Sequence, residues 1–195
     1  MNTSRTYTMR SRAVAAEETR QRILDAAARL LRSRLHSDIR LEDVAAGAEV
    51  SVQTVLRVFG SRGKLLRQAL EEVLAEIAEQ LRGAEPGDVD AAVRTWFDHY
   101  EAFGDVVVRS LAEEADPAVR PIVELGRAKH RERVELLFAP YLETMPAGRR
   151  ARVVDALVCT CDVYMWKLLR RDFGRSRAAA EKTMTLMVKS ILGSA

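Results

Sequence analysis

Hydrophobic residues in this chain repeat at helical spacing almost from end to end, and no segment alternates as a half-buried strand would. The first repeat consists of Ile23, Ala26, Ala27, Leu30 and Leu31, which share one face of a helix. Similar repeats follow as far as the C-terminal residues, with turn signals between them. We therefore expect an all-α protein of roughly nine helices.

Residues 40–66 predict two short helices joined by a tight turn, and a third helix that opens after Gly60. In the first short helix Leu41, Val44 and Ala45 form one apolar stripe, and Ser51 can cap the second helix. The second is expected to turn Val55, Leu56, Val58 and Phe59 inward and to leave Val52, Gln53, Thr54 and Arg57 outside. So short a helix is unstable alone, so its neighbours must hold it and present it to a partner. This is the organisation of a helix-turn-helix, whose second helix enters the major groove of DNA.

The rest of the chain predicts longer helices. Ser61 opens a helix that ends near Gly83, and Pro86-Gly87 marks the turn after it. Later helices are expected from Asp88 to Phe103, around Val106 to Leu111, from about Ala118 to Leu142, through Val154 to Leu168, and from Ser176 to Gly193. We therefore expect a DNA-binding domain at residues 16–76, with its helix-turn-helix at about 40–59, and a separate helical bundle at residues 77–195.

Residues 1–15 show no periodicity and contain Arg5, Arg10 and Arg12. This segment is interpreted either as a disordered leader or as a flexible basic arm that contacts DNA phosphates or the minor groove. The sequence leaves both interpretations open.

The charge of the chain is unevenly distributed, although its formal net value is only +3. The first 67 residues hold 13 Lys and Arg against 7 Asp and Glu, whereas the remainder holds 18 against 21. A basic first third on a mildly acidic body indicates that a polyanion is bound at one end only.

If the second short helix lies in a major groove, Gln53 is the best candidate for a base contact, because its amide can pair with adenine N6 and N7. Val52 and Thr54 offer methyl groups to thymine, and Arg57 can reach either guanine or a phosphate. The expected phosphate ligands are Arg40, Ser51, Ser61, Arg62 and Lys64. For each charged residue the alternative is a solvated surface position.

These residues resemble the tetracycline-repressor (TetR) family of transcription regulators. The resemblance covers residues 17–72 and lies in the stretches RQRILDAAARLL, LEDVAAGAEVS and VQTVLRVFGSRGKLL. The later segment WKLLRRDFGRSRAAAE is similar to a common connection into the last helix of that family. The resemblance implies an N-terminal three-helix DNA-binding unit. It also implies that the divergent helical body at residues 77–195 is a ligand-binding and dimerisation domain, which binds a small molecule and dimerises through its last two long helices.

Four residues depart from the family pattern. Glu49 replaces the usual glycine of the turn, so the turn must form without the conformational freedom of glycine. Leu56 replaces a common tyrosine that reaches a phosphate, and Val58 replaces a frequent aromatic residue or histidine. Arg40 stands where a capping threonine is usual, which exchanges a neutral cap for a charge that can meet a phosphate.

The body contains several large side chains close together in the sequence pattern. In an ordinary helical bundle they would form the core, whereas the family resemblance implies that some of them line an apolar cavity. The candidate pocket residues are Trp96, Phe97, His99, Tyr100, Phe103, Tyr164, Met165 and Trp166. A ligand held there would be a small hydrophobic or aromatic molecule, whose identity the sequence does not contain.

The last two long helices carry enough apolar positions to bury one face inside the subunit and another against a second copy. The expected interface residues are Val154, Leu157, Cys161, Ala180, Met184 and Met187. A two-fold homodimer would place two recognition helices about 34–36 Å apart, which fits a palindromic double-stranded DNA operator.

Other chemistry is disfavoured by the sequence. His36, His99 and His130 have no metal-ligand spacing, and there is no nucleophile elbow, phosphate loop or HExxH motif, so we expect neither a cofactor, a metal nor an enzyme. Cys159 and Cys161 point to different helix faces, so neither a disulfide between them nor a metal site of two thiolates is favoured. We expect both to be reduced thiols of a cytosolic protein. No apolar run is long enough for a membrane span and no secretory signal is evident, so we expect a cytoplasmic protein.

Three classes of function remain. The leading one is a dimeric repressor that a small ligand releases from its operator. The second is a DNA-binding regulator without a small ligand, controlled by a protein partner or by abundance. The third is a helical carrier or enzyme in which the helix-turn-helix has no role. The sequence contains neither the operator nor the sign of regulation.

Overall fold

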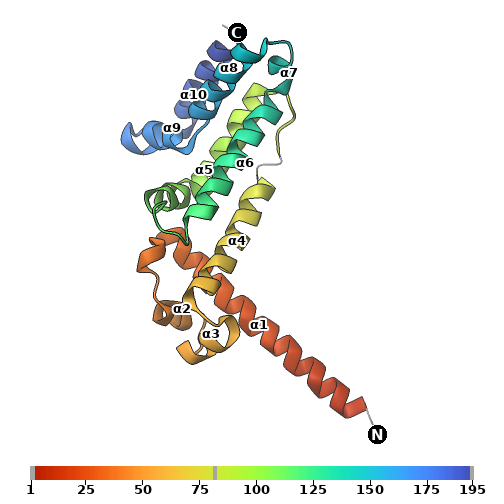
Figure 1. Cartoon of the computed structure of the whole chain (residues 1–195). Helices are drawn as coiled ribbons and strands as arrows, with labels where there is room; N and C mark the ends of the chain where they lie inside the picture. The colour runs from red at the N-terminus through yellow and green to blue at the C-terminus, as the bar shows by residue number, and fades with distance from the viewer. Residues whose placement is uncertain (1–2, 81–82, 194–195) are drawn as a thin grey trace. The chain divides into compact units, whose positions relative to one another are not determined.

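The computed structural model describes residues 3–80 and 83–193, and all regular structure in this part of the chain is helical, as expected from the sequence (Figure 1). The chain divides into two compact units, Met1–Ala75 and Glu76–Ala195. The side chains of residues 1–12, and with them the three arginines of the expected basic arm, lie outside the described part.

The first unit is a small helical domain. Its elements are α1 (Thr3–Ser33), the 3₁₀ turn η1 (His36–Asp38), α2 (Leu41–Gly47), α3 (Val52–Phe59) and most of α4 (Arg62–Gln80). Its core consists of apolar side chains from these helices, among them Ile23, Ala27, Val44, Val55 and Leu65. The short α2 packs against both α1 and α3, so α3 is held by its neighbours as its length requires.

Helix α1 begins earlier than the sequence pattern indicates. Its backbone is helical from Thr3, although residues 1–15 predict no regular element. Residues 13–18 are exposed, so no buried stripe marks this part of the helix. Extending an existing helix is much easier than nucleating one, and Ala, Arg, Met and Glu favour the helical state, which accounts for the added turns.

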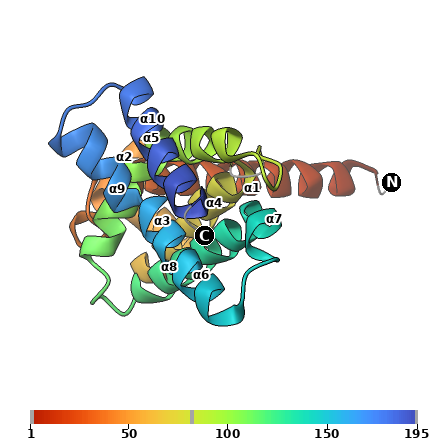
Figure 2. The ribbon, with the colours of Figure 1, turned by 90° about the horizontal axis from the view of Figure 1, so that it is seen from above.

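The second unit is built around α5 (Val89–Ala112). The other elements are α6 (Arg120–Leu137), α7 (Ala139–Leu142), α8 (Ala147–Thr160), α9 (Val163–Lys167), the π turn η2 (Leu168–Asp172) and α10 (Arg177–Gly193). Helix α5 packs against α6, α9 and α10, and α8 packs against α6 and α10 (Figure 2). Trp96, Phe97, Phe138, Leu157 and Trp166 are buried at the centre of this unit.

Three helix boundaries differ from those expected. Helix α5 continues without a break to Ala112, past Gly104. The expected helix through Leu142 is divided at Phe138, where Pro140 opens the short α7. The expected helix through Leu168 ends at Thr160, because the Asp162 carboxylate accepts a 2.9 Å hydrogen bond from the backbone N–H of Tyr164 and so caps α9.

The segment between α9 and α10 is wound more widely than an α-helix. The N–H of Phe173 donates to the carbonyl of Leu168 at 2.8 Å, five residues back, which closes the π turn. Gly174 follows with φ of 62°, a conformation that favours glycine, and Ser176 then caps α10 through the N–H of Ala179.

Candidate nucleic-acid interface

The turn between α2 and α3 is a Schellman motif centred on Glu49. The N–H of Val50 donates to the carbonyl of Ala45 at 3.0 Å, and the N–H of Glu49 donates to Ala46 at 3.2 Å. Glu49 adopts φ of 56°, the left-handed conformation that is usually occupied by glycine. The turn therefore forms with its ordinary hydrogen bonds, and the glutamate backbone bears the strain.

Ser51 caps α3, as the sequence predicts. Its Oγ accepts a 3.1 Å hydrogen bond from the N–H of Thr54 and lies 2.9 Å from the Thr54 hydroxyl oxygen. The two hydroxyls are thus engaged with each other at the start of the helix. Because its hydroxyl is paired, Thr54 offers its methyl group rather than a free donor to a partner outside.

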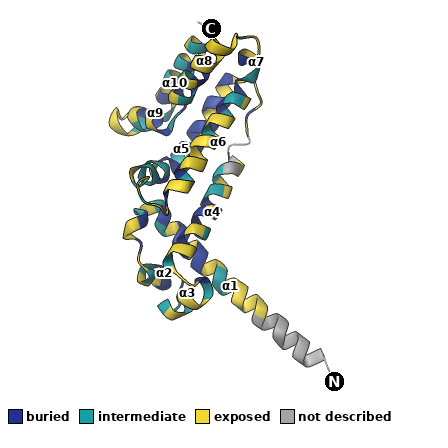
Figure 3. Ribbon diagram, viewed as in Figure 1, coloured by how far each residue is buried: buried dark blue, intermediate teal, exposed yellow. Residues whose placement is uncertain are grey.

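Helix α3 combines exposed and more buried positions (Figure 3). On its outward face Gln53 and Arg57 are exposed, while Val52 and Thr54 are half-buried. The inward face carries Val55 and Phe59, which are buried. The expectation for Leu56 is wrong, because its side chain is 41% exposed. Leu56 lies three residues after Gln53, so the two share a face and an apolar group adjoins the candidate base-contacting amide.

Two arginines of α1 hold these short helices in place. The guanidinium of Arg20 lies 5.2 Å from the centroid of the Phe59 ring and donates to Gln68 Oε1 at 2.7 Å. The guanidinium of Arg29 donates to the carbonyl of Gly47, at the end of α2, at 3.0 Å. Part of the basic charge counted in the sequence is therefore used inside the first unit.

The expected phosphate ligands fall into two groups. Arg40 and Lys64 are exposed, and Ser61 is exposed while its Oγ caps α4 by accepting from the N–H of Lys64 at 3.2 Å. Arg62 is different, because its side chain is half-buried and its guanidinium donates to two main-chain carbonyls of the first unit.

The candidate pocket residues of the body do not share one environment in the described structure. Trp96, Phe97 and Trp166 are at most 1% exposed and belong to the close-packed core, whereas Tyr164 is 53% exposed on the surface. Tyr164 therefore does not share the surroundings of these three residues, and a ligand site formed by the whole set stays a prediction. The remaining members have separate surroundings: Phe103 is buried and Met165 half-buried, and the buried Tyr100 hydroxyl donates to the carbonyl of Cys161 at 2.8 Å.

His99 is the one titratable member of that set whose buried nitrogen has no partner in the described structure. Its Nδ1 makes no hydrogen bond, and its ring stacks on Phe103 with centroids 5.8 Å apart. Burial, and secondarily the charge of His130, lowers the pKa of His99 from 6.5 to about 4. His99 is therefore neutral near pH 7.

A cavity of about 760 Å³ lies at another place in the second unit, where the start of α5, Tyr141 and the end of α10 meet. Its lining includes Val89, Leu192 and the ion pair of Asp90 with Lys189 at 2.9 Å. None of the residues proposed from the sequence as pocket lining contributes to it.

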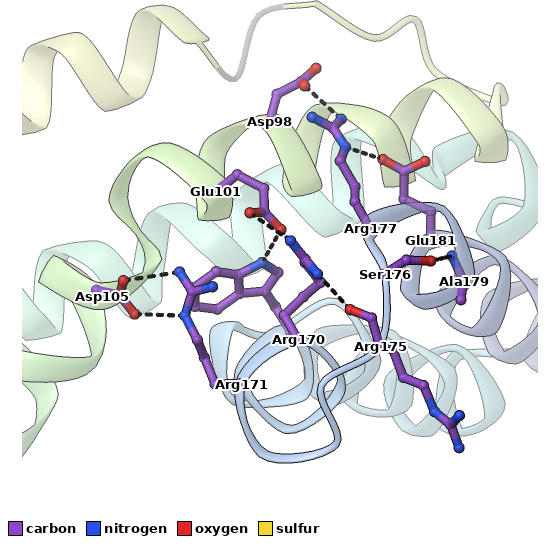
Figure 4. Close-up of polar contacts among 11 residues, drawn as sticks. Asp98, Glu101, Asp105, Arg170, Arg171, Arg175, Ser176, Arg177, Ala179 and Glu181 are labelled. Carbon is purple, nitrogen blue, oxygen red and sulfur yellow. Dashed lines mark hydrogen bonds and ion pairs between the residues drawn. The ribbon is translucent and has the colours of Figure 1, made fainter.

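Three acidic side chains of α5 hold the segment from α9 to α10 (Figure 4). Asp98 pairs with Arg177 at 2.7 Å, Glu101 with Arg170, and Asp105 with Arg171 at 3.0 Å. Glu101 also accepts a 3.2 Å hydrogen bond from the Trp166 indole N–H. The hydrogen bond from Arg170 holds the pKa of Glu101 below its usual value, so this half-buried carboxylate stays ionised.

The expected dimer-interface residues are also corrected. Val154, Leu157, Cys161, Ala180 and Met184 are at most 3% exposed within a single chain, so they are not available to a second copy. Met187 is half-buried. On α10 the large apolar residue that faces outward is Leu186, which is 67% exposed.

The part of the chain that the structure describes has no group of three or more His, Cys, Asp or Glu side chains that could hold a metal ion. No helix within those residues is long and apolar enough to cross a membrane.

Known proteins resemble this chain in both sequence and fold. Over 117 residues the chain is 34% identical to the HTH-type transcriptional repressor LfrR of Mycolicibacterium smegmatis, a match covering 57% of this chain and 61% of that protein. The crystal structure of a tetR-family transcriptional regulator from Streptomyces coelicolor superimposes with a TM-score of 0.70 at 18% identity, covering 91% of this chain and 82% of that one. The chain is thus similar in sequence to a transcriptional repressor and shares the fold of a tetR-family regulator. No family model matches the sequence.

The solved structure supports the fold of the chain, and the sequence match spans about three fifths of the curated relative. The resemblance drawn from the sequence motifs is confirmed.

Proposed function

We propose that this chain is a homodimeric transcriptional repressor that acts on DNA in the cytoplasm and binds a palindromic operator through α2 and α3. A small hydrophobic or aromatic ligand bound by the body would release it. The curated relative is named as a transcriptional repressor, which supports this proposal.

The observation that carries the proposal is the outward face of α3. A capped helix held by α1 and α2 presents Gln53 and Arg57 to solvent, with the methyl groups of Val52 and Thr54 beside them. An exposed amide and a guanidinium at the N-terminal half of such a helix are groups that recognise base edges in a major groove. Arg40, Ser61 and Lys64 supply polar groups suited to the flanking phosphates.

The proposal is tested by footprinting the DNA upstream of the chain's own gene. We expect protection of a site with two-fold sequence symmetry, and binding that weakens steeply as salt rises. Binding with the same affinity to scrambled DNA at every salt concentration would exclude a sequence-specific regulator.

The dimer is proposed through the outward faces of α8 and α10. Helix α10 exposes Leu186, and a groove of about 350 Å³ beside it is lined by both acidic and basic residues, including Asp90, Arg94 and Lys182. A patch that contains both signs of charge can complement itself across a two-fold axis. Sedimentation equilibrium of the protein and of Leu186→Asp is the test, and we expect a dimer and a monomer respectively.

A second candidate differs only in how the repressor is controlled. Trp96, Phe97 and Trp166 of the expected pocket are packed as core, which favours control by a protein partner or by abundance over control by a small ligand. Screening small apolar molecules by thermal shift separates the two. A ligand that raises the melting temperature and lowers operator affinity while the protein remains a dimer supports ligand control.

A further inference from the structure

Arg62, the first residue of α4, connects that helix to the segment before α2. Its Nε donates to the carbonyl of Ile39 at 2.7 Å, and its Nη2 donates to the carbonyl of His36. These two carbonyls lie 23 and 26 residues earlier in the chain. One planar guanidinium thus bridges two oxygens of the same connection.

The local electrostatics of α4 do not account for this cation. The first turn of a helix is the positive end of its dipole, where acidic groups are favoured and basic groups are not. The backbone N–H of Lys64, in this first turn, already donates to the Oγ of Ser61. What favours Arg62 at this position is its contact with the two carbonyl oxygens.

The start of α2 lacks the kind of cap that the neighbouring helices have. Ser51 caps α3 and Ser61 caps α4 with their hydroxyl oxygens, whereas Arg40 precedes α2 without a side-chain cap hydrogen bond. An N-terminal cap contributes about 0.5–2 kcal/mol to a helix. The Arg62 bridge holds the backbone immediately before Arg40, so it restrains the start of α2 by another route.

We propose that Arg62 is a positioning residue of the DNA-binding unit and not a phosphate ligand. It fixes residues 36–40 on the first turn of α4, and through them the position of Arg40 and the start of α2. This inference rests on the proposed function only for its effect on DNA binding, since the bridge itself belongs to the free protein.

Two substitutions separate the two roles. Arg62→Lys keeps a positive charge that can contact a phosphate, but an ammonium lacks the planar fork that spans two carbonyls. Arg62→Gln removes the charge as well. A phosphate ligand is therefore largely rescued by lysine, whereas a bridging residue is not.

The first measurement is hydrogen exchange of the free, full-length protein. We expect the amides of residues 44–48 to exchange about tenfold faster in both Arg62 variants, as the loss of hydrogen bonds of ordinary strength predicts. Arg67→Gln, an exposed arginine of the same helix, is the matched control and should leave these rates unchanged. Unchanged rates in the Arg62 variants, or faster exchange throughout the first unit, would overturn the proposal.

The second measurement is the salt dependence of binding to duplexes enriched from a random pool by rounds of selection on the wild-type protein. Each lost phosphate contact lowers the slope of log affinity against log salt by about 0.9. We expect that decrease for Lys64→Gln. For both Arg62 variants we expect several-fold weaker binding with the wild-type slope. A slope lowered by about 0.9 in Arg62→Gln and restored in Arg62→Lys would make Arg62 a phosphate ligand.

The two measurements test the proposed function and the bridging role of Arg62 separately. If the wild-type protein enriches no duplex, the proposed function is wrong, and the exchange rates still decide whether Arg62 restrains α2. If the wild-type protein binds and the exchange rates do not change, the function stands and the bridging role is wrong.

Discussion

The indole ring of Trp166 lies directly against the backbone of Gly104, and a Cβ on Gly104 would be 2.4 Å from Cζ3 of that ring. The guanidinium of Arg171 lies 4.6 Å from the centroid of the same ring. Gly104 is therefore needed for the close approach of α9 to α5. This contact explains why a glycine occupies the middle of a long helix, where it is otherwise unfavourable.

Substitution of Gly104 by Ala is expected to lower the free energy of unfolding by about 1–3 kcal/mol, because the added methyl overpacks a core that cannot yield. Urea denaturation measures the change. Gly126→Ala on α6 is the control, since a Cβ there meets nothing within 4 Å, and it should stabilise the protein by about 0.4–1 kcal/mol. Equal effects of the two substitutions would contradict the packing argument.

Substitution of Glu49 by Gly is expected to raise the free energy of unfolding. The left-handed conformation costs a non-glycine residue roughly 1–2 kcal/mol, from which the greater flexibility of glycine in the unfolded chain subtracts about 0.5–1 kcal/mol. Thermal and urea denaturation of Glu49→Gly and Glu49→Ala provide the comparison. Alanine retains the strain, so a gain of the same size in both variants would show that strain is not the cause.

Loss of the Glu101 carboxylate is expected to destabilise the second unit by about 1.5–3 kcal/mol, the range for hydrogen bonds to charged groups. Because its pKa is lower in the folded protein than its ordinary value of 4.5, the stabilisation is fully present above that pH and disappears as the pH falls through the lowered value. The difference between the wild type and Glu101→Gln should therefore be constant from pH 5 to 7 and shrink in more acidic solution. Asp155→Asn, at an exposed pair with Arg131, should change stability by less than about 1 kcal/mol.

His99 is expected to make the protein less stable as the pH falls from 6.5 towards 4. In this range the unfolded chain binds a proton at His99 and the folded protein does not, so the loss approaches about 1.4 kcal/mol per pH unit for this one group. His99→Leu should remove that part of the pH dependence and leave stability at pH 7 nearly unchanged, because Nδ1 has no partner to lose. Denaturation curves at pH 7, 6 and 5 test this, and parallel behaviour of the two proteins would refute it.

At the proposed DNA interface, Gln53→Ala is expected to relax specificity at one base pair of the operator half-site by about 1–3 kcal/mol, while binding to scrambled DNA is unchanged. Lys64→Ala should weaken binding to both sequences alike. Binding isotherms on matched and scrambled duplexes distinguish the two cases. Equal losses on both duplexes for Gln53→Ala would remove Gln53 from the base-contacting residues.

Sequence periodicity was sufficient for the helical fold and for the inward residues of the short helices. Val44, Ala45, Val55 and Phe59 are all buried as expected, and Ser51 caps α3. These features depend on neighbours three or four residues away, which the sequence displays directly. The pattern does not predict the outward position of Leu56, because a hydrophobic residue at the edge of an apolar stripe can face either the core or the solvent.

Contacts between distant segments were not predictable in the same way. An apolar stripe on α8 or α10 has the same sequence pattern whether it packs against its own chain or against a second copy. The pattern therefore predicts interface positions for Leu157 and Met184, although both side chains are buried within the chain. The side chain of Arg62 reaches a carbonyl 26 residues away, which no local pattern reveals. The large aromatic residues of α5 were ambiguous for the same reason, since core and pocket linings have similar composition.

The π turn at Leu168–Asp172 is a position where the chain can lose one residue without disturbing the core. A π turn holds one residue more than the α-helical turn it replaces, so deletion of one residue there leaves a regular helix. The same deletion within α5 would rotate every later side chain of that helix by about 100° and misplace Gly104 relative to Trp166. A homologue that is one residue shorter between Asp162 and Arg177 should therefore keep the same side chains in its core.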